Sequence, residues 1–316
     1  MAKIVLGLAT SHAPSLNGSA DRWPDAGKRD MERPTGGGIP MKLDIPKMIE
    51  ERASWIGKEL QPEVFERRHN SCQAAIETLA RTLREVNADV AVVVGDDTHE
   101  VFMPEDHIPP IDIFWGDELE HIPHFSREEN LKPNIWKGEP SLGRHMVESL
   151  VGDAFDISHT RAIAEGRHIG HAFDFVYGRI MQNKVPPHVP LFLNTYYPPN
   201  RPTVKRCYAL GRSLRRAIES WDSEKTVAVI ATGGLSHLVI DEELDQACIS
   251  AMQAKDADRL AALPEEKLIH GTSEFRNWVV TAGAMHEGAP MTMVAYEPCY
   301  RSPAGTGCAC AFAYWA

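Results

Sequence analysis

Four apolar, strand-like runs of this chain end in polar side chains that could act on a substrate. The runs span 3–12, 91–99, 190–195 and 226–237, and they end at His12, His99, Thr195 and His237. In open α/β sheets, ligands bind beyond the carboxyl ends of the strands. Imidazole binds metal ions and exchanges protons near neutral pH, so histidines at three such ends predict one assembled active site.

The second of these ends is unusually rich in charge. Residues 95–100 read Gly-Asp-Asp-Thr-His-Glu and place four ionisable groups together. Anionic side chains clustered in this way usually need a cation or a helix N-terminus nearby. The segment therefore indicates either a metal site or a solvated acidic turn.

The fourth end, residues 232–237, reads Thr-Gly-Gly-Leu-Ser-His. Paired glycines let the backbone approach a ligand closely. Ser236 does not lie in the G-x-S-x-G pattern of serine hydrolases, which leaves His237 as the predicted general base. Further along, Glu274 opens an apolar helix, where the helix dipole favours a carboxylate. Glu274 is therefore either a functional acid or a simple helix-start residue.

These residue types match a known metal site. Two neutral imidazoles and one carboxylate form the facial triad of non-haem Fe(II) oxygenases, which leaves positions open for substrate and oxygen. His12, His99 and Glu274 could supply that triad, with His237 as an unligated acid or base. The same set could instead bind Zn²⁺.

Two H-x-x-H pairs also occur, and neither matches the H-E-x-x-H zinc-protease pattern. His121 and His124 lie in a Pro-rich stretch, where we expect a structural role. His168 and His171 lie in a Gly-rich stretch, where we expect one of the two to be functional.

The elements that must position these groups follow from periodicity. A one-sided apolar stripe predicts a helix over 69–87, and the strand 89–95 follows directly. Strand, helix, strand is typical of a parallel βαβ unit. We therefore predict a single α/β domain over 1–316, with a central, mostly parallel sheet flanked by helices and long active-site loops. The Pro- and Gly-rich segment 13–46 is expected to be irregular and to cover the site.

The remaining expected elements are helices over 141–151, 204–221, 242–254, 257–263 and 273–285, and strands over 191–194, 226–231 and 291–297.

Composition excludes several classes of function. The chain has 316 residues, 43% of them hydrophobic, and a net charge of −11, which disfavours binding to nucleic acid through phosphate contacts. No apolar run approaches the ~20 residues of a membrane span. The six cysteines are scattered without a C-x-x-C pair, so their spacing does not indicate a zinc–thiolate site. With no signal-peptide pattern at the start, we expect a cytoplasmic protein with reduced, buried cysteines.

With these motifs in view, the chain resembles the class III extradiol ring-cleavage dioxygenases, the superfamily of the protocatechuate 4,5-dioxygenase catalytic subunit. Its single-subunit members that act on gallate-type or 3-O-methylgallate-type lignin aromatics are the most similar. The resemblance covers nearly the whole chain and is most specific at residues 4–12, 197–214, 232–237 and 273–274.

The resemblance implies roles for individual residues. His12 is similar to the first iron ligand, Glu274 to the carboxylate ligand and His237 to the base that deprotonates the catechol. The second histidine ligand of the family directly follows an Asn-Asp pair, whereas here Thr98 intervenes. The resemblance thus implies His99 as that ligand, with Asp97 as the alternative.

A further active-site histidine of the family corresponds to His171 or His168. The following Phe-Val-Tyr-Gly favours His171 as a second catalytic residue.

The implied activity is Fe(II)-dependent extradiol cleavage of a catecholic aromatic acid, with both atoms of O₂ inserted and no reductant consumed. The resemblance also implies a homo-oligomer. Two other functions remain open at this point. One is a zinc-dependent hydrolase or lyase that uses the same ligands, and the other is a non-catalytic adaptor of the same superfamily.

Overall fold

Four parallel strands form the centre of the molecule in the computed structural model, which describes residues 1–36, 39–105, 107–123 and 132–316. They lie in the order β1 (Lys3–Thr10), β10 (Thr226–Thr232), β4 (Val90–Gly95) and β9 (His188–Leu193). β4 and β9 are buried along their whole length. Such continuous apolar runs are expected of parallel strands that helices cover on both faces.

Antiparallel and mixed pairings extend this centre on both sides. β13 (Thr306–Trp315) pairs antiparallel with β1, and both β12 (Met291–Tyr300) and β11 (His237–Val239) pair with β13. On the other side, β5 (Ile111–Phe114) pairs antiparallel with β9 and parallel with β8 (Ser158–Thr160). Within the described part of the chain, these nine strands make one sheet. The predicted α/β class with a mostly parallel central sheet is confirmed.

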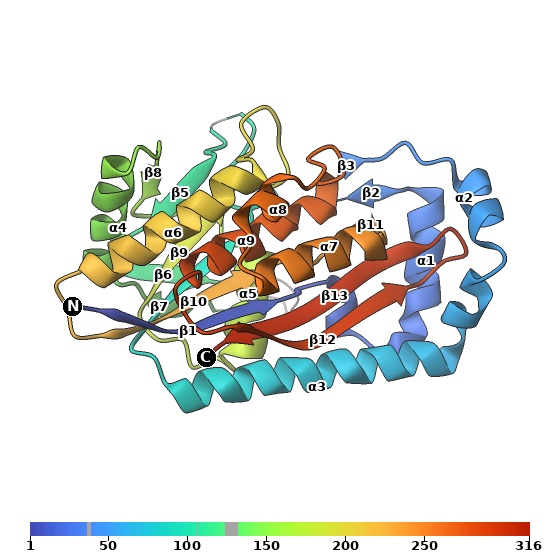
Figure 1. Cartoon of the computed structure of the whole chain (residues 1–316), viewed down its shortest axis with the longest axis horizontal. Helices are drawn as coiled ribbons and strands as arrows, with labels where there is room; N and C mark the ends of the chain where they lie inside the picture. The colour runs from blue at the N-terminus through green and yellow to red at the C-terminus, as the bar shows by residue number, and fades with distance from the viewer. Residues whose placement is uncertain (37–38, 106, 124–131) are drawn as a thin grey trace.

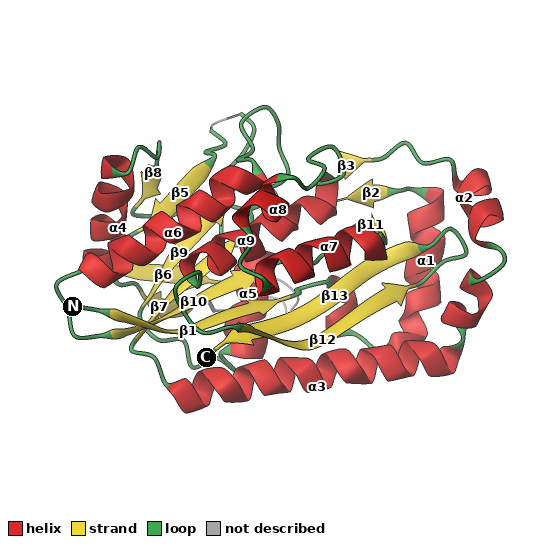
Figure 2. Ribbon diagram, in the orientation of Figure 1, coloured by secondary structure: helices red, strands yellow, loops and turns green. Residues whose placement is uncertain are grey.

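Helices cover both faces of the sheet (Figure 2). One face carries α4 (Pro140–Gly152), α6 (Val204–Ser220), α7 (Glu242–Gln253), α8 (Ala257–Ala261) and α9 (Phe275–Ala284). Leu210, Leu214 and Ile218 on α6 are fully buried, as their i, i+4, i+8 spacing predicts.

The opposite face is covered mainly by α3 (Pro62–Val86), the long helix that runs along β12 and β13 (Figure 1). α3 begins with a proline in its first turn and ends at Asn87, whose φ of 50° is the left-handed conformation of a helix C-cap. It starts seven residues before the predicted boundary. α5 (His171–Phe175) and the π-helical turn η4 (Val176–Ile180) complete this layer.

The segment 13–46 is more regular than expected. It contains α1 (Trp23–Glu32), whose second residue is a proline in the first helical turn, where proline is tolerated because that N–H needs no helical partner. The other elements between β1 and α3 are η1 (Pro14–Asn17), η2 (Ala20–Arg22), β2 (Thr35–Gly36), β3 (Ile39–Pro40), α2 (Ile45–Arg52) and η3 (Ile56–Leu60). Proline here marks the start of a helix rather than a break.

Sequence reasoning assigned no element to β13, although this strand is buried almost throughout and holds β12, β11 and β1 together. Residues 307–311, Gly-Cys-Ala-Cys-Ala, lack the β-branched and aromatic residues that identify a strand. Two short strands, β6 (Glu118–His121) and β7 (Asn134–Lys137), pair separately, and η5 (His270–Glu274) precedes α9.

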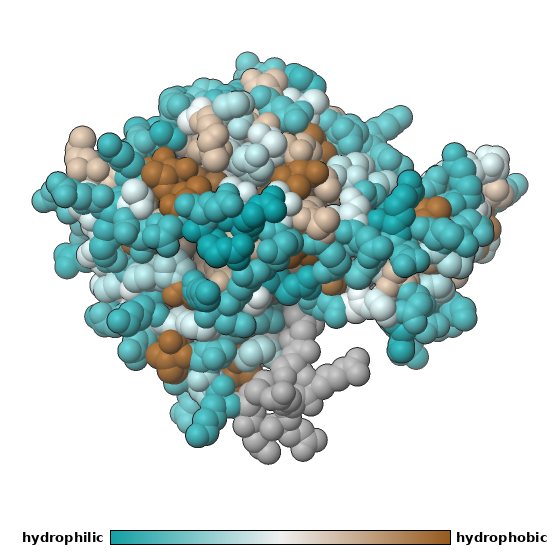
Figure 3. All heavy atoms as spheres, turned by 90° about the horizontal axis from the view of Figure 1, so that it is seen from below, coloured by the Kyte–Doolittle hydropathy of each residue, from teal (hydrophilic) through white to brown (hydrophobic). Residues whose placement is uncertain are grey.

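The surface seen from below in Figure 3 is mostly hydrophilic, with small separate hydrophobic patches. Large exposed apolar side chains on the described surface are Met1, Ile135 and Val151. Among the described helices, none combines the length and the apolar composition that crossing a membrane requires.

Candidate active site

The four parallel strands end side by side, and the chain places a polar group just beyond each end. His12 follows β1, the glycines at 233–234 follow β10, Asp96 follows β4 and Tyr196 follows β9. All are buried. The expected gathering of polar side chains at this sheet edge is therefore present in the structure.

His12 presents one ring nitrogen to this site. Its Nδ1 lies 2.9 Å from Thr232 Oγ1, and that hydroxyl donates its hydrogen to the carbonyl of Ala172. The hydroxyl can therefore only accept from His12, so Nδ1 carries the proton and Nε2 carries a free lone pair. Nε2 lies 3.4 Å from Glu274 Oε2.

Glu274 is almost fully buried at the end of η5 and accepts hydrogen bonds on both oxygens. The backbone N–H of Gly234 donates to Oε2 over 2.7 Å, and the Tyr196 hydroxyl donates to Oε1. Burial alone would raise the pKa of Glu274, but His237 and His12 hold it well below its usual range. The side chain is therefore a carboxylate.

Asp96 and His171 join His12 to form a compact group. One ligand atom from each of the three lies within 4.8 Å of the other two. Asn277 Nδ2 donates to Asp96 Oδ1 over 3.0 Å, while the buried Oδ2 makes no hydrogen bond to a described residue. Burial, and then the charge of Glu274, raise the pKa of Asp96 to about 7.

Glu100 orients His171. Its Oε1 lies 2.5 Å from His171 Nδ1 and also accepts from the His171 backbone N–H. Burial would lower the pKa of His171, but Glu100 raises it to about 9 in the absence of a cation. Metal-binding histidines almost always donate the other ring nitrogen to such a partner. His12 and His171 both follow this pattern.

His237 lies beside Glu274 and is held by close backbone contacts. Its Nδ1 lies 2.8 Å from the carbonyl of Leu235, so Nδ1 donates there and Nε2 faces Glu274 Oε1 at 3.2 Å. A Cβ on Gly271 would lie 2.2 Å from His237 Nε2, so only glycine permits this ring position.

The structure places His99 and Asp97 differently from the expectation. His99 stacks on Tyr197 with ring centroids 3.8 Å apart, and its Nδ1 bonds to the carbonyl of Phe102. Asp97 accepts from the backbone N–H groups of 99, 101 and 102, so its carboxylate organises the turn. Among the described residues, neither belongs to the close group around His12. The acidic neighbour Asp96 does.

The other two flagged histidines lie outside the site. His168 lines a separate hollow with Glu118 and Arg161, away from His12. His121 is buried and bonds Asp174 over 2.8 Å, in keeping with the structural role expected of it. Its partner in the motif, His124, lies outside the described residues.

A cavity of about 220 Å³ opens onto the cluster. His12, His171, Tyr196, His237, Glu274 and Arg301 contribute to its wall. A cavity of about 150 Å³ accommodates a benzene ring, so this space suits one substituted aromatic ring. Thr35 of β2 also lines it, so the segment 13–46 borders the site as expected.

Arg301 was not predicted as a site residue. It comes from the turn between β12 and β13 and pairs with Asp30 of α1 through Nε at 2.5 Å and Nη2 at 2.9 Å. Its Nη1 makes no hydrogen bond to a described residue. The basic residues Arg201, Lys205 and Arg206, which follow β9 in the chain, do not line the cavity.

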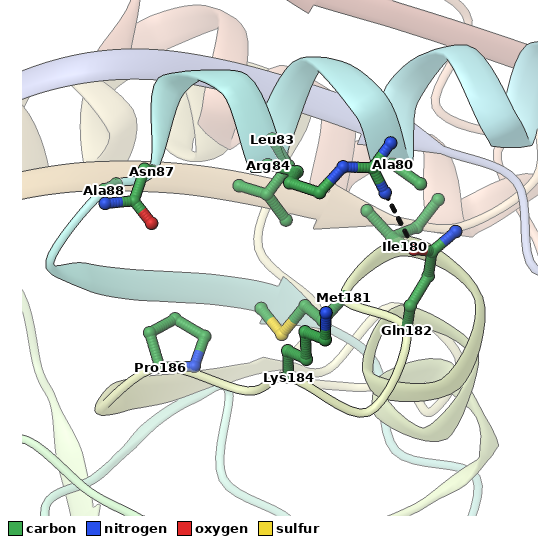
Figure 4. A pocket seen from close by; sticks show the side chains of 10 residues that line it. All are labelled: Ala80, Leu83, Arg84, Asn87, Ala88, Ile180, Met181, Gln182, Lys184 and Pro186. Atoms are coloured by element: carbon green, nitrogen blue, oxygen red, sulfur yellow. Dashed lines mark hydrogen bonds between the residues drawn. The ribbon is translucent and has the colours of Figure 1, made fainter.

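Another hollow lies at the far end of α3, lined by residues of 80–88 and 180–186 (Figure 4). Arg84 bonds there to Gln182 over 2.9 Å. None of its described lining residues is a histidine, cysteine or carboxylate. This hollow therefore offers neither a metal ligand nor a general base.

The donor atoms around His12 fit a divalent cation. His12 Nε2 points at Glu274 Oε2 over 3.4 Å, so one cation could bind both atoms. The unpartnered Asp96 Oδ2 places a second anionic oxygen in the same buried region. Imidazole and carboxylate donors suit iron, zinc and manganese.

Comparison with known proteins gives three results. A protein family described as the catalytic LigB subunit of aromatic ring-opening dioxygenase matches residues 54–305. A gallate dioxygenase of Pseudomonas putida is 38% identical over 108 residues, which cover 33% of this chain and only 30% of that enzyme. The match to the crystal structure of an uncharacterized Escherichia coli K12 protein, JW3007, covers 77% of this chain and 92% of the chain in that structure. The two structures have a TM-score of 0.50 and the sequences are 13% identical, so this match supports a shared fold and nothing more.

Proposed function

Because the chain belongs to the family of the catalytic LigB subunit of aromatic ring-opening dioxygenase, we propose that it is an Fe(II)-dependent extradiol dioxygenase. Its proposed substrate is a catecholic aromatic acid of the protocatechuate, gallate or 3-O-methylgallate type. One observation carries the proposal: two oriented histidines and two carboxylates surround one point, and His237 stands beside them as a separate base.

We assign the metal to His12, His171, Asp96 and Glu274. His171 here takes the place expected for His99, since its ring lies with His12 and Asp96 in one close group and its Nδ1 is held by Glu100. When bound, iron supplies one centre at which the catechol oxygens and O₂ meet in reactive geometry.

The protein's own part in the reaction begins at His237. With Nδ1 donating to the Leu235 carbonyl, Nε2 is the nitrogen that accepts a hydroxyl proton from the substrate. A cation near Glu274 would share the charge that otherwise holds a proton on His237, which frees Nε2 for this task. A positioned base of this kind contributes roughly 10²–10⁴-fold to the rate.

Other residues position the substrate and the carboxylate. Tyr196 and the Gly234 N–H bind Glu274 and fix its orientation. Arg301 is the cation that lines the described cavity, and its free Nη1 suits a substrate carboxylate. The match to a gallate dioxygenase supports an aromatic acid as substrate.

Oxygen uptake tests the proposal directly. Protein reconstituted anaerobically with Fe(II) would be offered protocatechuate, gallate, 3-O-methylgallate and catechol, with Zn²⁺-loaded protein as control. We expect uptake and a ring-opened chromophore with at least one carboxylated substrate, and only with iron. His237→Ala is expected to keep stoichiometric iron but to lower kcat at least about 100-fold.

Two outcomes would overturn this assignment. Equal turnover with zinc would indicate hydrolytic or lyase chemistry. Loss of iron from His237→Ala would make that histidine a ligand rather than a base.

A further inference from the structure

A second cluster of metal-binding side chains lies inside the protein, apart from the histidine site. Cys72 of α3, Cys299 of β12 and Cys310 of β13 are buried, and their sulfur atoms all lie within 4.8 Å of one another. Residues 238 positions apart in the sequence thus meet where α3 packs on the β12–β13 hairpin (Figure 1).

The strand register explains why the thiols converge. Cys299 pairs directly with Cys308 across the hairpin, and Cys310 lies two residues further along β13. Side chains two apart on a strand share a face, so these three cysteines project to the same side. α3 brings Cys72 onto that side.

A buried cation stands next to this cluster. Arg68 is only 6% exposed and lies one helical turn before Cys72, so both side chains are on the same face of α3. Its Nη2 pairs with Glu59 over 2.6 Å and its Nε lies 3.9 Å from Glu297, while the buried Nη1 makes no hydrogen bond to a described residue. A buried guanidinium favours negative charge nearby, and thiolates would add to the charge of these two carboxylates.

Cys207, a buried cysteine outside the cluster, behaves differently. Burial raises its pKa to about 12, as expected for an isolated thiol in an apolar core. In the cluster, hydrogen bonds from Cys299 and Cys310 lower the pKa of Cys72 to about 5 against the effect of burial, whereas the pKa values of Cys299 and Cys310 are raised. The thiolate, not the thiol, is the form that binds metal ions.

We propose that Cys72, Cys299 and Cys310 form a structural site for a thiophilic metal ion, with Zn²⁺ as the expected occupant. Three thiolates and a divalent cation leave one negative charge, which the neighbouring guanidinium of Arg68 favours although Glu59 also pairs with it. Cys308, which is next to Cys310 on the same face, is the nearest candidate for a fourth thiolate, but it also lines the active-site cavity and contacts His237. Such a bond would tie α3 to the hairpin that also supplies Arg301 to the cavity.

Cobalt(II) provides a probe that distinguishes this site from the histidine site. Sulfur ligands produce a strong thiolate-to-cobalt charge-transfer absorption, whereas the imidazole and carboxylate donors around His12 do not. The full-length protein would be produced with cobalt or zinc in the medium, because the enclosed site must be filled during folding, and then dialysed under reducing conditions.

We expect one equivalent of cobalt with a thiolate charge-transfer band in the unaltered protein. The band should persist in the variant His12→Ala/Glu274→Gln, in which the proposed iron site is lost, and in the control Cys248→Ala. It should disappear in Cys310→Ser, with circular dichroism used to verify folding. This design keeps the outcome separate from that of the dioxygenase proposal.

If Cys310→Ser does not fold, the absorption band and the metal content of the unaltered protein test the proposal by themselves. Absence of the charge-transfer band and of any zinc beyond the histidine site would show that the three thiols only fill space. Persistence of the band in a folded Cys310→Ser variant would equally overturn the assignment.

Discussion

At the scale of single residues, the hydrogen-bond partner of Nδ1 in each site histidine determines what Nε2 of that ring can do. Thr232 accepts a hydrogen bond from Nδ1 of His12, and Glu100 accepts one from Nδ1 of His171. The Leu235 carbonyl accepts one from Nδ1 of His237. For His12 and His237, Nε2 then faces the Glu274 carboxylate. His99 lacks this arrangement, because its ring is stacked on Tyr197 and its Nδ1 serves the turn.

Substitution of His171 and substitution of His99 are therefore expected to have different effects on metal affinity. His171→Ala is expected to lower metal affinity about 100-fold or more, since it removes a ligand, whereas His99→Ala is expected to change it little. Equilibrium metal binding under anaerobic conditions, followed by atomic emission, would measure both. The reverse order of effects would restore His99 as the second histidine ligand.

At the scale of elements, the order β1, β10, β4, β9 is what brings the site together. Parallel neighbours end at the same edge, so a residue just beyond one strand meets residues just beyond the next. β9 depends on a buried polar contact at its start. His188 accepts from the Tyr177 hydroxyl at 2.8 Å and donates from Nδ1 to the carbonyl of Lys137 at 3.0 Å.

This contact predicts a pH dependence of stability. Burial lowers the pKa of His188 to about 4, from 6.5, so the folded protein keeps this ring neutral where the unfolded chain has bound a proton. The free energy of unfolding should therefore fall as pH decreases from about 6.5 to about 4, by up to about 3 kcal/mol from this residue.

Urea unfolding at several pH values would test this prediction. His188→Gln can keep both hydrogen bonds but does not titrate, so its stability should depend less on pH across that window. The exposed His159→Gln is the matched control and should behave like the unaltered protein. An unchanged pH dependence in His188→Gln would contradict the assignment.

At the scale of the whole molecule, the cavity wall combines segments from opposite ends of the chain. Arg301 reaches it from the β12–β13 turn, and Asp30 on α1 holds Arg301 through two hydrogen bonds. A Cβ on Gly27 would lie 1.8 Å from the Arg301 carbonyl, so glycine is required where α1 meets this turn.

This arrangement predicts a selective effect on substrate binding. Arg301→Gln should raise KM for gallate or protocatechuate roughly 10- to 100-fold, because a charge-assisted hydrogen bond is lost, and should leave KM for catechol nearly unchanged. Arg201→Gln, outside the cavity, is the control. A similar rise for catechol would mean that the substitution disturbs the site as a whole.

The sequence by itself determined the fold class and pointed to residues that the structure brings to one site. Apolar runs such as β4 and β10 are strands in almost any surroundings, and His12, Glu274 and His237 lie in local motifs that indicate their chemistry. The family match confirms the predicted resemblance. These features can be predicted from the sequence because they depend on residues that are close together in the chain.

Only the tertiary structure decided which further groups meet them. His99 and Asp96 are three residues apart in one turn, and the path of that turn sends Asp96 to the site and His99 to Tyr197. Likewise, no spacing in the sequence indicates that Cys72 meets Cys310, because their contact depends on the packing of α3 against the hairpin. Side-chain direction and long-range packing are set by the whole fold, so local patterns do not contain them.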